Sequence, residues 1–151
     1  MTQPANLPFL FGRFTAILQD HEHLGTTLKR LRAMCVALEA PNPNLDALEP
    51  KRLLQDLQTD LSAHFGAEEA DAYFGTIADE APALATGIAQ LKLEHTAMLA
   101  ALSTLCRLAS GSGNARELSL ATRQLIAELE RHERAESSLL RSLFVPGVSG
   151  G

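Results

Sequence analysis

The chain has 151 residues, enough for one domain with a substantial apolar core. Leu and Ala dominate, and a composition with one Tyr and no Trp favours helices. The formal net charge of -5 argues against a nucleic-acid partner, since binding to phosphate backbones needs clustered Lys and Arg. No apolar run reaches the ~18 residues of a membrane span, and the start of the chain lacks an export-signal pattern. We therefore expect a cytoplasmic protein without a membrane or nucleic-acid partner.

Residues 1–8 form a polar lead that we expect to be loose, and a helical pattern begins at Phe9. Its apolar residues recur at spacings of three and four until the prolines of segment 41–44 end the helix. A second helix begins within 45–51 and carries an apolar stripe from Leu54 to Ala72. Segment 75–79 is predicted to be the break between the second and third helices. Asp79 is the expected N-cap of the third helix, and Pro82 lies in its first turn.

The third helix ends at the glycine- and serine-rich loop 110–114, and the fourth carries apolar residues from Leu118 to Leu143. Residues 145–151 are expected to be a disordered tail. Four long amphipathic helices with short loops predict an all-α, antiparallel up-down-up-down four-helix bundle over residues 9–144. Cys35 and Cys106 do not form a metal-type pair, and we expect reduced core thiols.

Polar residues interrupt the apolar stripe of every helix, and a histidine precedes a glutamate by four residues in two of them. Side chains at i and i+4 share one helical face, so each pair projects inward. Histidines of neighbouring helices are equidistant from the predicted turns between them, which places all four at one level. The glutamates lie one turn further on, ~6 Å along the axis. The six inward residues are His21, His64, Glu68, His95, His132 and Glu136.

Other polar residues near this layer fall outside the stripes. His23 is about 200° round the helix from His21, and Glu69 is about 100° from the stripe. Tyr73, nine residues after His64, is about 180° away and is predicted not to face the site. Glu22 and Glu94 are interpreted as solvated residues. His23 is expected to be exposed, with a role beside the site as the alternative.

Imidazoles and carboxylates in a dry core need a partner, because a buried unpaired carboxylate is costly. Two cations would use every donor. Each would bind two histidines, and the two would share both carboxylates and a bridging oxo or hydroxo group. Nitrogen and oxygen donors suit iron, with manganese or zinc as substitutes. Any one of these histidines alone would fit a core residue bonded to a backbone carbonyl. A single histidine–glutamate pair at i and i+4 would fit a surface contact. Four histidines at matched heights favour the metal site.

From about Phe14 to Leu143 the chain resembles the hemerythrin-like, or HHE cation-binding, domains. The resemblance rests on residues 20–21 (Asp-His), 64–69 (His-Phe-Gly-Ala-Glu-Glu), 94–95 (Glu-His) and 132–136 (His-Glu-Arg-Ala-Glu). It implies a four-helix bundle whose non-haem di-iron centre is held by the same six residues. Oxygen-carrying hemerythrins have a further histidine one turn after the third-helix histidine, where this chain has Leu99. The resemblance therefore implies sensing or handling of iron, dioxygen, nitric oxide or peroxide rather than oxygen carriage.

Three functions follow as hypotheses. The first is a di-iron protein that binds a small diatomic or peroxide ligand. The second is a di-iron oxidoreductase, such as a peroxidase or oxidase. The third is a metal-free helical interaction module, for which the apolar residues Phe9, Phe11 and Ile77 are candidate contacts. No particular protein partner is indicated.

Overall fold

The computed structural model describes residues 7–111 and 114–144, and all regular structure in these ranges is helical. This confirms the all-α class and the four long helices. None of the described helices has the length and apolar character needed to cross a membrane. The long helices are α1 (Leu7–Leu38), α3 (Pro50–Glu69), α5 (Ala85–Ser110) and α6 (Ala115–Phe144). The short elements are α2 (Leu45–Leu48), the π-helix η1 (Asp71–Gly75), α4 (Thr76–Glu80) and the 3-10 helix η2 (Pro82–Leu84).

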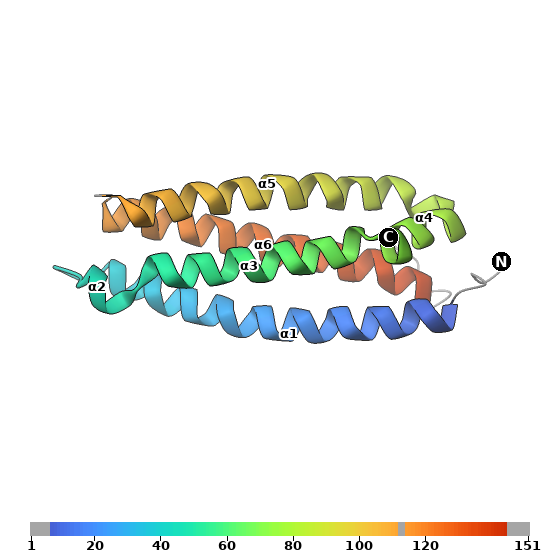
Figure 1. The fold of residues 1–151 in the computed structure, drawn as a ribbon, viewed down its shortest axis with the longest axis horizontal. Coiled ribbons are helices and arrows are strands. Elements are labelled where there is room, and N and C mark those ends of the chain that lie inside the picture. Colours follow the sequence, from blue (N-terminus) through green and yellow to red (C-terminus); the bar gives the residue numbers. More distant parts are fainter. Residues whose placement is uncertain (1–6, 112–113, 145–151) are drawn as a thin grey trace.

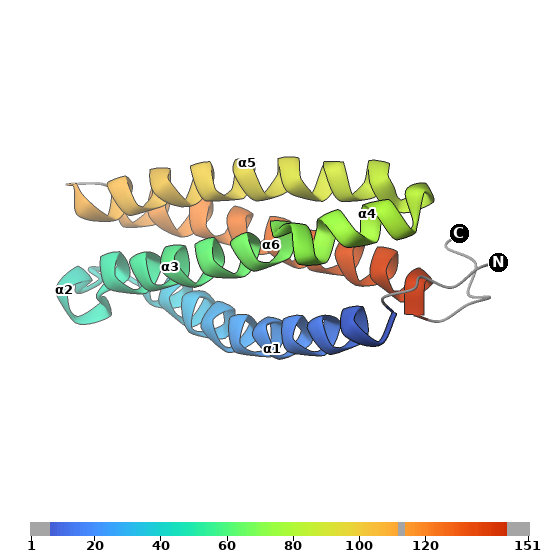
Figure 2. The same cartoon turned by 45° about the vertical axis from the view of Figure 1, so that its right-hand side comes forward.

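The four long helices lie lengthwise in one elongated bundle, with α2 at one end and α4 at the other (Figure 1). The principal contacts join α1 to α3, α3 to α5, α5 to α6 and α6 to α1. Each long helix therefore has two neighbours, and α3 lies diagonally opposite α6. The turned view in Figure 2 shows the same arrangement. Four apolar stripes converge on one interior, as amphipathic helices require.

Most helix ends lie close to the predicted boundaries, but α1 begins earlier than predicted. Leu7 and Pro8, assigned to the loose lead, belong to its first turn. Proline is accepted there because the first N–H groups of a helix have no partner within the helix. Residues 1–6, residues 112–113 of the predicted loop and the predicted tail lie outside the described residues.

The predicted break at residues 75–79 is wrong. The helical path is interrupted at Ala70, whose ψ is 143°, and at Ala81, whose ψ is 76°. The π-helix η1 and α4 fill the interval, and Asp79 lies within α4 instead of capping the next helix. Apolar burial explains this outcome, because Phe74 and Ile77 are completely buried here. Ile77 is therefore a core residue, whereas Phe9 and Phe11 are more than half exposed.

The core consists of two apolar clusters. The larger cluster contains Leu24, Leu61 and Met98, and the smaller contains Ile17, Leu91 and Leu140. Along α1 and α5, the smaller cluster precedes the histidine position and the larger one follows it. A polar layer thus separates the two clusters. Leu18, which its spacing of four from Phe14 would place on the inward stripe of α1, is instead 40% exposed. Cys35 is buried and Cys106 partly buried, and neither is in a disulfide.

Candidate metal centre

The six inward residues come together in the polar layer, and every long helix contributes at least one. They form two overlapping groups in which one nitrogen or oxygen atom from each residue lies within 4.8 Å of the others. Both groups contain Glu68 and Glu136, which are completely buried. His21 and His64 complete the first group, and His95 and His132 complete the second. Each half of the chain therefore supplies the two histidines of one group. This buried cluster could hold a metal ion.

Glu68 lies between the histidines of the two groups. Its Oε1 atom is 3.3 Å from Nε2 of His64 and 3.3 Å from Nε2 of His95. Glu136 has the corresponding place on α6, with Oε2 at 3.7 Å from Nε2 of His132 and 3.9 Å from Nε2 of His21. Each carboxylate thus faces one histidine of each group. A carboxylate in this position can bridge two cations through its two oxygens.

Most of the nitrogen and oxygen atoms that point into the layer lack hydrogen-bond partners. Both carboxylate oxygens of Glu68 and Glu136 are buried and unpaired, and so are the Nε2 atoms of His95 and His132. In the first group, Nε2 of His21 lies 3.1 Å from Nε2 of His64. Buried polar groups are normally paired, and an unpaired buried carboxylate is costly. A bound metal ion would satisfy these atoms, so the residues present fit a metal site.

Three of the four histidines are held from behind by a carboxylate on the neighbouring helix. The Nδ1 atom of His95 lies 2.7 Å from Glu69, and that of His132 lies 2.7 Å from Glu94. Asp20 lies 3.4 Å from Nδ1 of His64. A hydrogen bond at Nδ1 fixes the ring and leaves Nε2 free for a metal, which is the usual arrangement behind a metal-binding histidine.

The interpretation of Glu94 as a solvated residue is therefore wrong. Its side chain is 35% exposed and reaches His132 on α6. Burial opposes ionisation, but hydrogen bonds from His132 and Gln90 hold the pKa of Glu94 below its usual value. Glu69 lies off the stripe and outside both groups, as predicted, but it holds His95. A sequence signal exists: Asp20, Glu69 and Glu94 each adjoin one of the six inward residues.

The ring of Phe65 packs against both histidines of the second group. It stacks on His95 with centroids 3.8 Å apart and an interplanar angle of 8°.

Burial lowers the pKa of His132, although the hydrogen bond to Glu94 acts in the opposite direction. Burial, and then the neighbouring His64, lower the pKa of His21 to about 4. Neutral imidazole is the form that binds metals, so these histidines need not release a proton at neutral pH.

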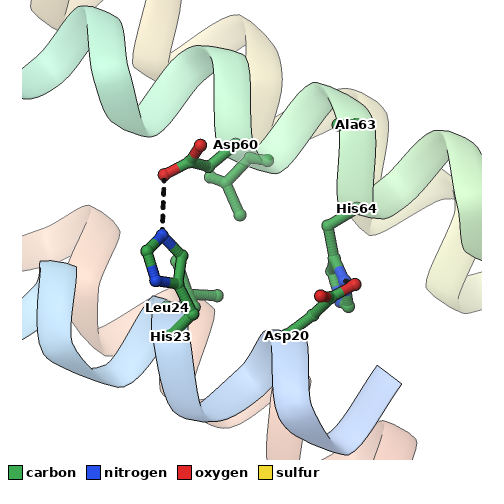
Figure 3. Close-up of a pocket in the computed structure, with 7 residues that line it drawn as sticks. Asp20, His23, Leu24, Asp60, Ala63 and His64 are labelled. Carbon is green, nitrogen blue, oxygen red and sulfur yellow. Dashed lines mark hydrogen bonds and ion pairs between the residues drawn. The ribbon is translucent and has the colours of Figure 1, made fainter. Parts of the chain in front are cut away.

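A narrow cavity of about 210 Å³ between α1 and α3 reaches the layer at His64. Figure 3 shows the Asp20 carboxylate beside the His64 ring, and a separate pair between His23 and Asp60 across the cavity. The His23–Asp60 distance is 3.5 Å, and the His23 side chain is 71% exposed, as predicted. His23 is therefore outside the candidate centre.

A wider groove of about 750 Å³ between α1 and α6 reaches the layer at His21. His21 is the most accessible of the six residues, with 12% of its side chain exposed. Glu133 lines the same groove, and its Oε1 atom is buried without a partner. Burial, followed by the charges of Glu130 and Glu68, raises the pKa of Glu133 to about 7. The groove offers a small molecule an approach to the layer at His21.

Replacing Glu94 with alanine is expected to weaken metal binding about 10- to 100-fold, because His132 loses the acceptor that orients its ring. Competition with a chromophoric chelator measures the affinity. Asp56→Ala removes an exposed carboxylate of α3 and should leave the affinity unchanged. Equal affinities in the two variants would refute this role of Glu94.

Comparison of the chain with protein-family models, with curated proteins and with solved structures gives no match in any of the three.

Proposed function

We propose that this chain is a cytoplasmic, hemerythrin-like protein whose bundle holds two iron ions in the polar layer. The observation that carries the proposal is the pair of overlapping donor groups with unpaired buried oxygens in their shared glutamates. His21 and His64 hold one ion, and His95 and His132 hold the other. Glu68 and Glu136 belong to both groups and would contribute to holding both ions. Manganese and zinc are substitutes with the same preference for nitrogen and oxygen donors.

The bound ions supply Lewis acidity and, for iron, redox chemistry. The protein contributes a dry environment, oriented imidazoles and an approach along the groove at His21. We infer that the centre binds or senses a small ligand such as dioxygen, nitric oxide or peroxide. Leu99 packs against the larger apolar cluster, in the position where oxygen carriers have a further histidine. This difference favours sensing or handling over reversible oxygen carriage. We also propose that the four long helices have the antiparallel up-down-up-down topology of the hemerythrin-like fold.

The proposal is tested by metal analysis of the protein produced with iron. We expect about two iron ions per chain, as the shared-carboxylate arrangement requires, and a near-UV charge-transfer band of a ferric pair. His64→Ala should lose both the metal and the band. His23→Ala provides the matched control, because it removes an exposed histidine outside both groups.

Iron-free wild-type protein, with a melting temperature that iron and zinc do not change, would overturn the proposal. That result would favour the metal-free interaction module, because binding to the native state alone must raise stability. A His64→Ala variant that retains the full metal content would also contradict the assignment of the site.

A further inference from the structure

Tyr73 has a buried hydroxyl that nothing in the fold explains. Its side chain is completely buried, and its hydroxyl oxygen has no hydrogen-bond partner. A buried tyrosine normally finds a partner for its hydroxyl, because leaving it unpaired is costly. Every other buried residue of the smaller cluster is aliphatic or phenylalanine. The hydroxyl is thus the one side-chain hydrogen-bond donor of that described cluster.

An unusual backbone path places this side chain inside. In an uninterrupted helix Tyr73 points away from the layer, about 180° from His64. The interruption at Ala70 and the π-helix η1 change that direction, and the Tyr73 backbone N–H bonds to the Ala70 carbonyl at 2.8 Å. Short π-helical segments are rare and occur frequently at functional sites. The chain therefore uses an uncommon local structure to bury a hydroxyl that remains unpaired.

The smaller cluster covers the glutamate side of the polar layer. Its member Leu140 follows Glu136 by one turn of α6, and Leu91 precedes His95 by one turn of α5. The Tyr73 ring stacks on Phe74 with centroids 5.5 Å apart, and Phe74 stacks on His95 at 6.1 Å. Burial, then the charge of Glu68, raises the pKa of Tyr73, while Arg13 lowers it. The phenol is therefore protonated at neutral pH and available as a donor.

We propose that the Tyr73 hydroxyl donates a hydrogen bond to a small anionic ligand bound at the metal pair, on the side where the glutamates lie. The inference rests on the proposed function. It narrows the ligand class to small anions, such as azide or a peroxide anion, whose terminal negative charge a hydrogen-bond donor stabilises. A neutral donor in a water-excluded pocket stabilises an anion without first paying to reorganise solvent. Tyr73 is a positioning and selectivity residue here, and the metal pair is the binding centre.

The test is azide binding to the iron-loaded full chain, followed by its absorption band, in wild type and Tyr73→Phe. The substitution keeps the ring and removes the hydroxyl. We expect azide affinity to fall roughly tenfold to a hundredfold, as for loss of a hydrogen bond to an anion. The iron content of the two proteins should be the same.

Thr122→Val is the matched control, because Thr122 is also completely buried and its hydroxyl is also unpaired. It lies ten residues before His132 on α6, about 15 Å along the helix axis. Both substitutions remove a buried unpaired hydroxyl, so both should raise the melting temperature of the metal-free protein by a few degrees. Only Tyr73→Phe should change azide affinity.

The outcomes distinguish the two proposals. Unchanged azide affinity in an iron-loaded Tyr73→Phe variant overturns the role of Tyr73 and leaves the metal centre standing. A visible phenolate-to-iron absorption band in wild type, absent from Tyr73→Phe, also overturns it, because Tyr73 is then a metal ligand. Absence of iron from the wild-type protein overturns the metal centre and, with it, the role of Tyr73.

Discussion

Replacing Glu68 with leucine is expected to stabilise the metal-free protein and to remove its stabilisation by metal. Without a cation, the buried carboxylate has two unpaired oxygens, and exchanging it for an apolar side chain recovers that cost. The gain is about 1–3 kcal/mol of unfolding free energy. With metal present, the wild type gains about 4 kcal/mol at a free metal concentration a thousand times the dissociation constant. The variant loses the shared bridge and should gain almost nothing.

Thermal unfolding with and without metal measures both effects. For a chain of this size, 4 kcal/mol corresponds to a rise of about 10 °C in melting temperature. Asp56→Leu, on the exposed face of the same helix, is the control and should retain the metal-dependent rise. A Glu68→Leu protein less stable than wild type without metal would show that the carboxylate has a partner in the metal-free fold.

The pH dependence of the metal-free protein is expected to change in opposite directions in two variants. His21 is neutral in the folded state down to about pH 4, but its unfolded form gains a proton below pH 6.5. Its contribution to stability is therefore complete above pH 6.5 and is lost as the pH falls toward 4. The loss is about 3 kcal/mol. His21→Leu removes this acid sensitivity.

Glu133 acts in the opposite sense. Its folded pKa of about 7 lies above the ordinary value of 4.5, so the folded state binds the proton first as the pH falls. Acidification from pH 7 to 4.5 therefore adds about 3 kcal/mol of stability relative to a variant without this carboxyl group. Glu133→Gln should make the protein more sensitive to acid. In the wild type the two contributions largely offset each other.

Denaturant unfolding at several pH values between 4 and 7.5 measures these differences, and His23→Ala is the control because that side chain is exposed. The quantity compared is the difference from wild type at each pH, so that titration of other carboxylates cancels. Parallel curves for all three variants would contradict both pKa shifts.

Much of the centre could be predicted because regular helices translate sequence spacing directly into direction. His64 and Glu68 lie four residues apart on α3, and the structure keeps them on one face. Equal distances from the loops placed histidines of different helices at one level, and the two donor groups contain all of them. Counting about 100° per residue placed His23 outside the layer, and its side chain is exposed.

The wrong predictions arose where a helix is irregular or where a contact with an adjacent helix determines the surroundings of a side chain. The predicted break at residues 75–79 was wrong, because Ala70 leaves the helical conformation earlier and the π-helix η1 follows it. No spacing rule anticipates that interruption. Glu94 was taken as solvated because its own helix turns it away from the stripe. A side chain beside the stripe faces the neighbouring helix, and there it meets His132.

The polar layer between the two apolar clusters also determines how the domain holds together. The smaller cluster joins the first turns of α1, the segment from η1 to η2, the first turns of α5 and the last turns of α6. Apolar packing links the residues within each cluster. The layer between the two clusters contains buried histidine nitrogens and glutamate oxygens without hydrogen-bond partners. Cooperative units of a protein separate where favourable contacts are few. Under the proposed function, metal occupancy therefore decides whether the two ends of the bundle unfold as one unit or as two.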